Sequence, residues 1–211
     1  MTAGNEAHGI SKQAIMEFFD RLAPHWDDGL MVDEAKINAI LDAAGVGPGS
    51  HVLDVACGTG VLFPFYAQRN AAKVTGVDIS PEMVKIALRK IEGPRFEALC
   101  ADIETLPVAQ KYDCCVVYNA FPHFPEPARL IERLSAWLKP GGRLTVAHGM
   151  SLEVLNRHHA GSAAEVSRGL IPAPEMAALF SGRFRVDRAV SDEEKYIVSG
   201  ILPPTEEDDG A

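Results

Sequence analysis

The stretch Val52-Leu53-Asp54-Val55-Ala56-Cys57-Gly58-Thr59-Gly60 decides the fold of this 211-residue chain. Its apolar residues predict a buried strand over 51–56, and the glycines predict a turn into a helix, where backbone amides can bind an anionic group. A dinucleotide fingerprint needs a third glycine where Phe63 stands, and a phosphate-binding P-loop needs a Lys–Ser/Thr pair where Val61-Leu62 stands. The turn therefore favours a ligand without a pyrophosphate group.

Helices and short apolar strands alternate on both sides of this stretch. The patterns predict strands at 51–56, 73–77, 95–100, 112–118, 143–147, 184–190 and 195–201, and helices at 11–22, 33–44, 80–91, 126–138, 151–159 and 174–181, with one more ending near 69. This order predicts an α/β fold: a seven-stranded, mostly parallel, doubly wound sheet of five βα units and a C-terminal antiparallel hairpin. Helices should cover both faces, and the N-terminal helices should form a lid.

Composition narrows the classes of partner. The formal net charge is −9 and no basic run is present, which argues against a nucleic acid partner. No segment approaches the roughly 20 apolar residues that span a membrane, and no signal peptide opens the chain, so we expect a cytoplasmic protein. The cysteines lack zinc-type spacing, so we expect buried reduced thiols and no metal site: Cys57, Cys100, Cys114 and Cys115.

Three acids follow or lie in three successive strands. Asp54 precedes the glycine turn, and Asp78 comes 24 residues later, at the end of the second strand, where an acid can bind both hydroxyls of a ribose. Asp102 follows the third strand and can accept a hydrogen bond from an exocyclic adenine amine. Because parallel strands end at one edge of the sheet, these acids predict a nucleoside site there.

Together these segments resemble the motifs of class I S-adenosylmethionine-dependent methyltransferases. The resemblance covers about residues 15–202 and rests on Asp54–Gly60, Gly76–Ser80, Ala101–Ile103 and the turn Leu138–Leu144. The segment Phe19–Asp27 is also similar to one that many small-molecule and quinone-type members fold over the cofactor. The resemblance implies a single domain over 1–211, with a helical cap (1–45) and a Rossmann-like core (50–202), and the run of acidic residues predicts a disordered tail over 203–211.

The resemblance also implies the cofactor and its contacts. S-adenosyl-L-methionine would be the methyl donor, and a small molecule would accept the methyl group by in-line displacement. The residues that would bind the cofactor are Asp54, Ala56, Gly58, Gly60, Asp78, Ile79, Met83, Asp102, Ile103 and Asn119.

The acceptor end is predicted from histidines and aromatic residues. A base is needed only if the acceptor arrives protonated, and His148 and His123 are the candidate bases because imidazole titrates near neutrality. The residues expected to bind the acceptor are Phe19, Trp26, Phe121, His158 and His159. One hypothesis is that His148, one of the pair His158 and His159, and His123 converge there to bind a metal or deprotonate a thiol.

Two other functions remain open at this point. A non-catalytic protein could bind the same cofactor, since methyl transfer needs no invariant catalytic side chain. A nucleotide-dependent oxidoreductase is disfavoured by Phe63. The sequence does not indicate the acceptor, its attacking atom or the oligomeric state.

Overall fold

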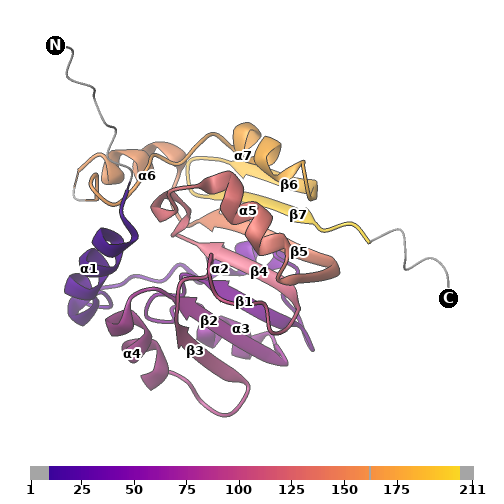
Figure 1. Ribbon diagram of the computed structural model, residues 1–211, viewed down its shortest axis with the longest axis horizontal. Coiled ribbons are helices and arrows are strands. Elements are labelled where there is room, and N and C mark those ends of the chain that lie inside the picture. Colours follow the sequence, from indigo (N-terminus) through magenta and orange to yellow (C-terminus); the bar gives the residue numbers. More distant parts are fainter. Residues whose placement is uncertain (1–9, 162, 205–211) are drawn as a thin grey trace.

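A seven-stranded sheet forms the centre of the computed structural model, which describes residues 10–161 and 163–204 (Figure 1). Its spatial order is β3 (Phe96–Cys100), β2 (Lys73–Asp78), β1 (His51–Val55), β4 (Tyr112–Tyr118), β5 (Leu138–His148), β7 (Tyr196–Ile201) and β6 (Arg185–Ser191). The first five strands are parallel, while β7 runs antiparallel to both β5 and β6. The predicted doubly wound sheet with a terminal hairpin is confirmed.

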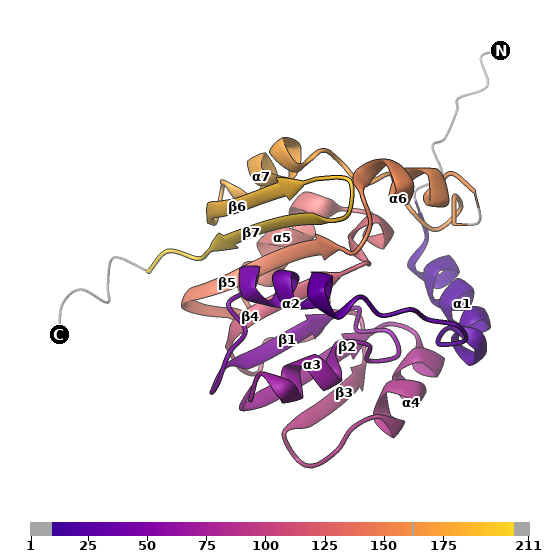
Figure 2. The ribbon, with the colours of Figure 1, turned by 180° about the vertical axis from the view of Figure 1, so that it is seen from behind.

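Helices cover both faces because the central strands are apolar on both sides. On one face, seen in Figure 2, lie α2 (Glu34–Ala43) and α3 (Phe63–Gln68). On the other lie α5 (Pro127–Ser135) and α7 (Ala173–Phe180), as Figure 1 shows. Successive residues of β4 alternate between these layers, since Cys114 and Val116 pack with α2 and α3 while Cys115 and Val117 pack with α5 and α7.

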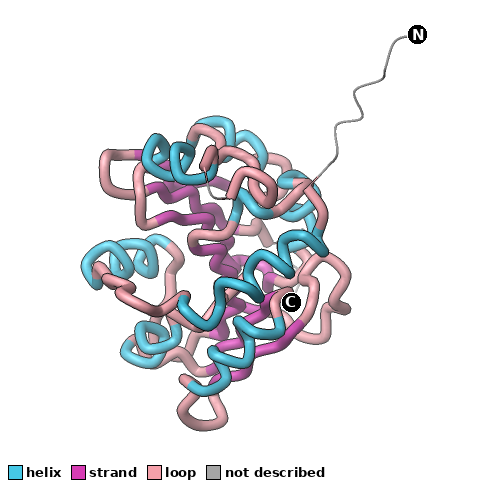
Figure 3. The backbone as a smooth tube through the Cα atoms, turned by 90° about the vertical axis from the view of Figure 1, so that its left-hand side faces the viewer, coloured by secondary structure: helices cyan, strands magenta, loops and turns pink. Residues whose placement is uncertain are grey.

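Two helices lie beyond the carboxyl ends of the parallel strands. They are α1 (Lys12–Leu22), continued by the short turn η1 (Ala23–His25), and α6 (Leu152–His159). Figures 1 and 2 both place them at the same end of the molecule, and in Figure 3 the strands run between helices on either side. Ile15 of α1 packs against Ala163 and Val166, which follow α6. Helix α1 with η1 therefore forms the expected lid, whereas α2 packs on the sheet.

Three sequence expectations need correction. No helix connects β3 to β4 in the described chain; residues 101–111 form turns, so the expectation of five βα units is wrong. Strand β5 begins at Leu138, because Leu138 pairs with Tyr112 before a register shift that accommodates the Pro140–Gly142 turn. Cys100 is exposed rather than buried, since it lies on edge strand β3.

The acidic tail expected at 203–211 lies outside the described residues from 205 onward. Within the described part of the chain, no helix is long and apolar enough to cross a membrane.

Candidate functional site

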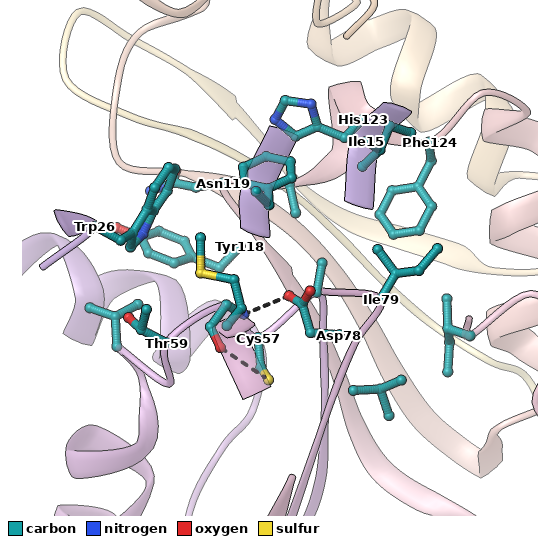
Figure 4. A pocket seen from close by; sticks show the side chains of 18 of the residues that line it. Ile15, Trp26, Cys57, Thr59, Asp78, Ile79, Tyr118, Asn119, His123 and Phe124 are labelled. Carbon is teal, nitrogen blue, oxygen red and sulfur yellow. Dashed lines mark hydrogen bonds between the residues drawn. The ribbon is translucent and has the colours of Figure 1, made fainter. Parts of the chain in front are cut away.

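A cavity of about 430 Å³ opens at the carboxyl ends of β1, β2 and β4, beneath the lid helix α1. This is the edge at which open α/β sheets bind ligands. Figure 4 shows Asp78 and Ile79 on one side of the cavity and Trp26, Asn119 and His123 on another. Eleven residues predicted from the sequence line it: Phe19, Trp26, Ala56, Gly58, Asp78, Ile79, Met83, Asp102, Ile103, Asn119 and His123.

Asp78 fixes the glycine turn against the start of α4 (Pro81–Arg89). Its Oδ2 accepts a hydrogen bond from the Gly58 amide at 2.8 Å, and its Oδ1 accepts one from the Ser80 amide at 2.9 Å. Ala56 reaches the turn with φ +54°, a conformation that non-glycine residues adopt uncommonly. The backbone at the end of β1 is therefore held in one strained shape around the cavity, as functional sites often are.

Phe63 explains why the third glycine of a dinucleotide fingerprint is missing. A Cβ atom on Gly60 would lie 2.8 Å from the Phe63 ring, and one on Gly76 would lie 2.9 Å from it. In a dinucleotide-binding fold, a glycine at this position lets the helix pack closely against the sheet. In this chain the Phe63 ring occupies the space between α3 and the sheet instead. Gly60, which has φ +78°, therefore serves this packing and does not line the cavity.

Two buried carboxyl groups, those of Asp54 and Asp78, lie at the turn without a basic partner among the described residues. Burial raises the pKa of Asp54 well above its usual value, and the charge of Asp78 adds to the effect. Burial also raises the pKa of Asp78, although its backbone hydrogen bonds oppose the shift. Within the described residues neither acid forms a salt bridge, and Oδ2 of Asp54 has no hydrogen-bond partner. A cationic ligand group beside the turn would relieve both charges.

Lys12 occupies the other end of the cavity and was not singled out from the sequence. Its ammonium lies 2.6 Å from Asp102 Oδ2 and 2.5 Å from Glu104 Oε2. The pKa of Lys12 is raised: burial lowers it, but these two carboxylates outweigh that effect. Only the fold brings the start of α1 to the end of β3, so no local sequence signal marks this contact.

The lid is attached to the core at two further points. Asp20 of α1 accepts hydrogen bonds from the Ser80 hydroxyl and, at 3.2 Å, from the Glu82 amide at the start of α4. Asp27 accepts one from the Thr59 hydroxyl at 2.7 Å and lies 2.6 Å from the Lys90 ammonium. The lid thus contacts the glycine turn itself, so its position depends on the shape of that turn.

Aromatic residues surround His123 at the remaining end of the cavity. The Phe19 ring packs edge-on against the rings of His123 and Trp26, with centroid distances of 4.9 Å and 5.6 Å. Asn119, with φ +54°, accepts a hydrogen bond from the Gly149 amide at 3.0 Å and so ties the end of β4 to the end of β5. Tyr118, which precedes Asn119, also lines the cavity, so this compartment combines aromatic walls with a few polar groups.

With this geometry established, comparison with known families shows which kind of domain the chain resembles. Residues 52–142, which contain the glycine turn, Asp78 and Asp102, match the family model described as "Methyltransferase domain". Over these residues the chain is therefore similar to methyltransferase domains.

Named relatives of this methyltransferase domain act on different molecules. Ubiquinone biosynthesis O-methyltransferase from Coxiella burnetii is 34% identical over 143 residues, which are 64% of this chain and 61% of that protein. Malonyl-[acyl-carrier protein] O-methyltransferase from Acetivibrio thermocellus is 31% identical over 138 residues, 64% of this chain and 49% of that protein. The chain thus spans less than two thirds of the length of these curated relatives.

The fold is shared with solved methyltransferases. Magnesium protoporphyrin IX methyltransferase from Synechocystis, solved with bound S-adenosylhomocysteine, superposes with a TM-score of 0.69 at 21% identity. The match covers 91% of this chain and 100% of that one. The match therefore extends well beyond residues 52–142.

Six predicted site residues of the methyltransferase domain do not line the cavity. Asp54 and Gly60 lie behind the turn, Phe121 is buried in the core, and His158 is exposed on α6. His159 packs against His123 at a centroid distance of 5.2 Å, so these two histidines do come together. His148 is fully buried, and neither ring nitrogen has a hydrogen-bond partner among the described residues.

The histidines do not form a metal centre in this arrangement. Within residues 10–161 and 163–204, no group of three His, Cys, Asp or Glu side chains is placed to hold a metal ion. Burial lowers the pKa of His148 to about 3, and the neighbouring His159 and His123 add to that effect.

Proposed function

We propose that this chain transfers a methyl group from S-adenosyl-L-methionine to a small-molecule acceptor by in-line displacement. The observation that carries the proposal is the glycine turn that lines the cavity beside two buried acids, Asp78 in the lining and Asp54 behind the turn, which form no salt bridge within the described residues. S-adenosyl-L-methionine supplies an ammonium and a sulfonium, which is the charge that this end of the cavity lacks. The bound S-adenosylhomocysteine of the Synechocystis relative supports the same ligand class.

The cofactor would extend from the glycine turn toward Asp102. Ala56 and Gly58 would contact its methionine part, while Asp54 orders the turn from behind and Gly60 sets its shape. Asp78 would bind the ribose, since each carboxylate oxygen can accept a second hydrogen bond beyond those from the backbone. The adenine would lie against residues that line the cavity beyond Asp78: Ile79, Met83, Asp102 and Ile103.

The acceptor would enter beside Asn119, between the lid and the end of β4. Phe19, Trp26 and His123 surround that space, and we place the acceptor there with Phe121, His158 and His159 outside its direct contact. Apolar walls with few polar groups are typical of small-molecule sites. Four free cysteines suit a reducing compartment, which supports a cytoplasmic location.

Alignment is the main catalytic task, because the sulfonium methyl is already electrophilic. Holding the attacking atom, the methyl carbon and the sulfur in line can lower the activation free energy by several kcal/mol. The lid contacts of Asp20 and Asp27 would close the cavity over both reactants and exclude water.

The first prediction concerns cofactor uptake. Calorimetry with S-adenosylhomocysteine should show binding, and Asp78→Asn should weaken it about 10- to 100-fold, because hydrogen bonds to a charged group contribute roughly 1.5–3 kcal/mol. Asp42→Asn is the matched control: Asp42 is exposed on α2, does not line the cavity, and pairs with Arg69 among the described residues.

Unchanged affinity in Asp78→Asn, with the thermal transition retained, would contradict the proposed site. Cofactor uptake without turnover of any acceptor in a metabolite screen would instead favour a non-catalytic binding protein.

A further inference from the structure

The carboxylate of Asp78 is held from two sides by backbone amides. One amide belongs to Gly58, in the turn after β1, and the other to Ser80, the residue before α4 (Figure 4). Each oxygen of Asp78 therefore accepts one hydrogen bond and retains a second lone pair that can accept from a ligand hydroxyl. The direction of these lone pairs depends on where the two loops lie.

Ser80 connects Asp78 to the lid. Its amide donates to Oδ1 of Asp78 at 2.9 Å, and its buried hydroxyl donates to Oδ1 of Asp20, which lies on α1. The same hydroxyl accepts a bond from the Met83 amide at 3.1 Å. A hydroxyl has only one proton to donate, so Asp20 is the acceptor that fixes its direction.

Asp20 also contacts the backbone of α4. Its Oδ1 accepts a bond from the Glu82 amide at 3.2 Å, so one oxygen bridges the hydroxyl of Ser80 and the first turn of the helix. The amides at the start of a helix lack partners within the helix, so a side-chain oxygen stabilises them. Asp20 therefore fastens the lid to the segment that carries Ser80.

A second acid, in the turn after η1, holds the other loop in the same way. The buried hydroxyl of Thr59 donates to Oδ1 of Asp27 at 2.7 Å, and Thr59 directly follows Gly58. Asp27 is also paired with Lys90 at 2.6 Å. The two loops that bond Asp78 are thus each joined to the lid segment by a buried hydroxyl, so the docked lid brackets the carboxylate.

The negative charge of Asp20 does not account for this arrangement. Burial raises the pKa of Asp78, its backbone hydrogen bonds oppose the shift, and the charge of Asp20 adds to it. That effect is unfavourable for an acid that accepts hydrogen bonds in its charged form. What Asp20 contributes is therefore an oxygen atom in a fixed position.

We propose that Asp20 is a positioning residue for the nucleoside. Through Ser80 it holds the carboxylate of Asp78 in the direction that accepts both ribose hydroxyls, so the docked lid is part of the ribose site. This inference rests on the proposed binding of S-adenosyl-L-methionine and adds to it a coupling between the lid and the ribose. Because such coupling is reciprocal, a ligand with both hydroxyls holds α1 against the core.

S-adenosylhomocysteine and its 2′,3′-dideoxy analogue test this role, because they differ only in the ribose hydroxyls. Calorimetry gives the affinity of each ligand for the wild type, Asp20→Ala, Asp20→Asn and Asp28→Asn. A lid residue with a merely structural role would weaken both ligands equally and leave the ratio of the two affinities unchanged. Asp28 is the matched control, an exposed acid that does not line the cavity and bonds to His25 of its own segment.

The wild type should prefer S-adenosylhomocysteine about 10- to 100-fold, since each hydroxyl donates to a charged group. Asp20→Ala should lower this preference about tenfold, because Ser80 loses its acceptor. Asp20→Asn keeps an oxygen that can accept from Ser80 and Glu82, so its preference should stay within about threefold of the wild type. Asp28→Asn should match the wild type. An equal loss in Asp20→Asn and Asp20→Ala would overturn the role of the oxygen.

Ser80→Ala tests the route from Asp20 to Asp78. It removes the hydroxyl but keeps the amide that bonds Asp78. The preference should fall as much as in Asp20→Ala, and the double variant should lose no more than either single variant, because both changes break one contact. Additive losses would show that Asp20 does not act through Ser80.

Hydrogen exchange in the wild type tests the coupling without any substitution. At equal saturation, S-adenosylhomocysteine should slow the exchange of the α1 amides more than the dideoxy analogue does. Equal protection by the two ligands would overturn the coupling, and so would equal affinity of the wild type for both or an unchanged ratio in Asp20→Ala. Failure of the wild type to bind either ligand would instead overturn the proposed function itself.

Discussion

At the scale of single residues, burial decides which of the chemically suitable side chains can act. His148 and His123 are equally suitable from the sequence, yet His148 is completely buried beside Tyr196, with ring centroids 6.0 Å apart. Asp54 is buried likewise, behind the turn that Asp78 fastens. The strand pattern predicted that these residues end or occupy central strands. It could not tell which lie in front of the turn and which behind, because that depends on neighbouring strands.

The buried His148 gives a prediction about stability. Its pKa in the folded protein is about 3, below the usual value of about 6.5. The stability associated with the neutral ring is therefore complete above pH 6.5 and is lost as pH falls from there toward 3, because only the unfolded chain takes up the proton. One such group contributes up to ~1.4 kcal/mol per pH unit.

Urea unfolding at pH 7 and pH 5 measures this loss. Between pH 7 and pH 5, the free energy of unfolding of His148→Phe should fall by about 1–2 kcal/mol less than that of the wild type. The reason is that the unfolded variant has one histidine fewer to take up a proton. His51 is partly exposed, so the free energy of unfolding of His51→Gln should fall between pH 7 and pH 5 by nearly as much as that of the wild type. An identical loss in His148→Phe would show that His148 does not titrate with unfolding.

At the scale of elements, the lid is the feature that the sequence described least. The apolar spacing of Ile15, Phe18, Phe19 and Leu22 predicted a helix over 11–22 but not its partners. Polar residues of α1 and of the turn after η1 make the specific contacts, with Lys12 at Asp102, Asp20 at Ser80 and Asp27 at Thr59. An amphipathic pattern reports only which face is buried, so these contacts required the fold.

Lys12 provides the prediction at this scale. Lys12→Ala should speed dissociation of S-adenosylhomocysteine about fivefold, because it removes a partly buried ion pair of roughly 1 kcal/mol that holds the lid over Asp102. Stopped-flow displacement measures the rate, and added salt should narrow the difference. Lys85→Ala is the control, since Lys85 is exposed on α4 and, within the part of the chain that the structure describes, pairs with its own helix at Glu82. Equal dissociation rates in the two variants would show that Lys12 does not help to hold the lid over the bound ligand.

At the scale of the whole molecule, the cavity joins parts of the chain that are far apart in sequence. Its walls come from α1, the glycine turn, the ends of β2 and β4, and Gly149 and Met150 after β5. A ligand that contacts all of these binds only the folded protein, so it should stabilise the whole molecule rather than one segment.

S-adenosylhomocysteine at about 100 times its Kd should add ~2.7 kcal/mol to the free energy of unfolding. For a domain of this size that corresponds to a rise in Tm of about 5–10 °C. Scanning calorimetry checks the shift, and Asp78→Asn at the same ligand concentration should show a smaller one. A wild-type Tm that the ligand leaves unchanged would contradict binding to the folded cavity.

The sequence by itself determined the order of elements, the parallel sheet with its terminal hairpin, and the edge at which a nucleoside would bind. It could do so because strand periodicity and glycine turns are local properties of the chain. Tertiary structure alone decided that Lys12 meets Asp102, and that His123 faces the cavity while His148 is buried. Those outcomes depend on contacts between residues as many as 90 positions apart, such as Lys12 and Asp102, and no local pattern encodes them.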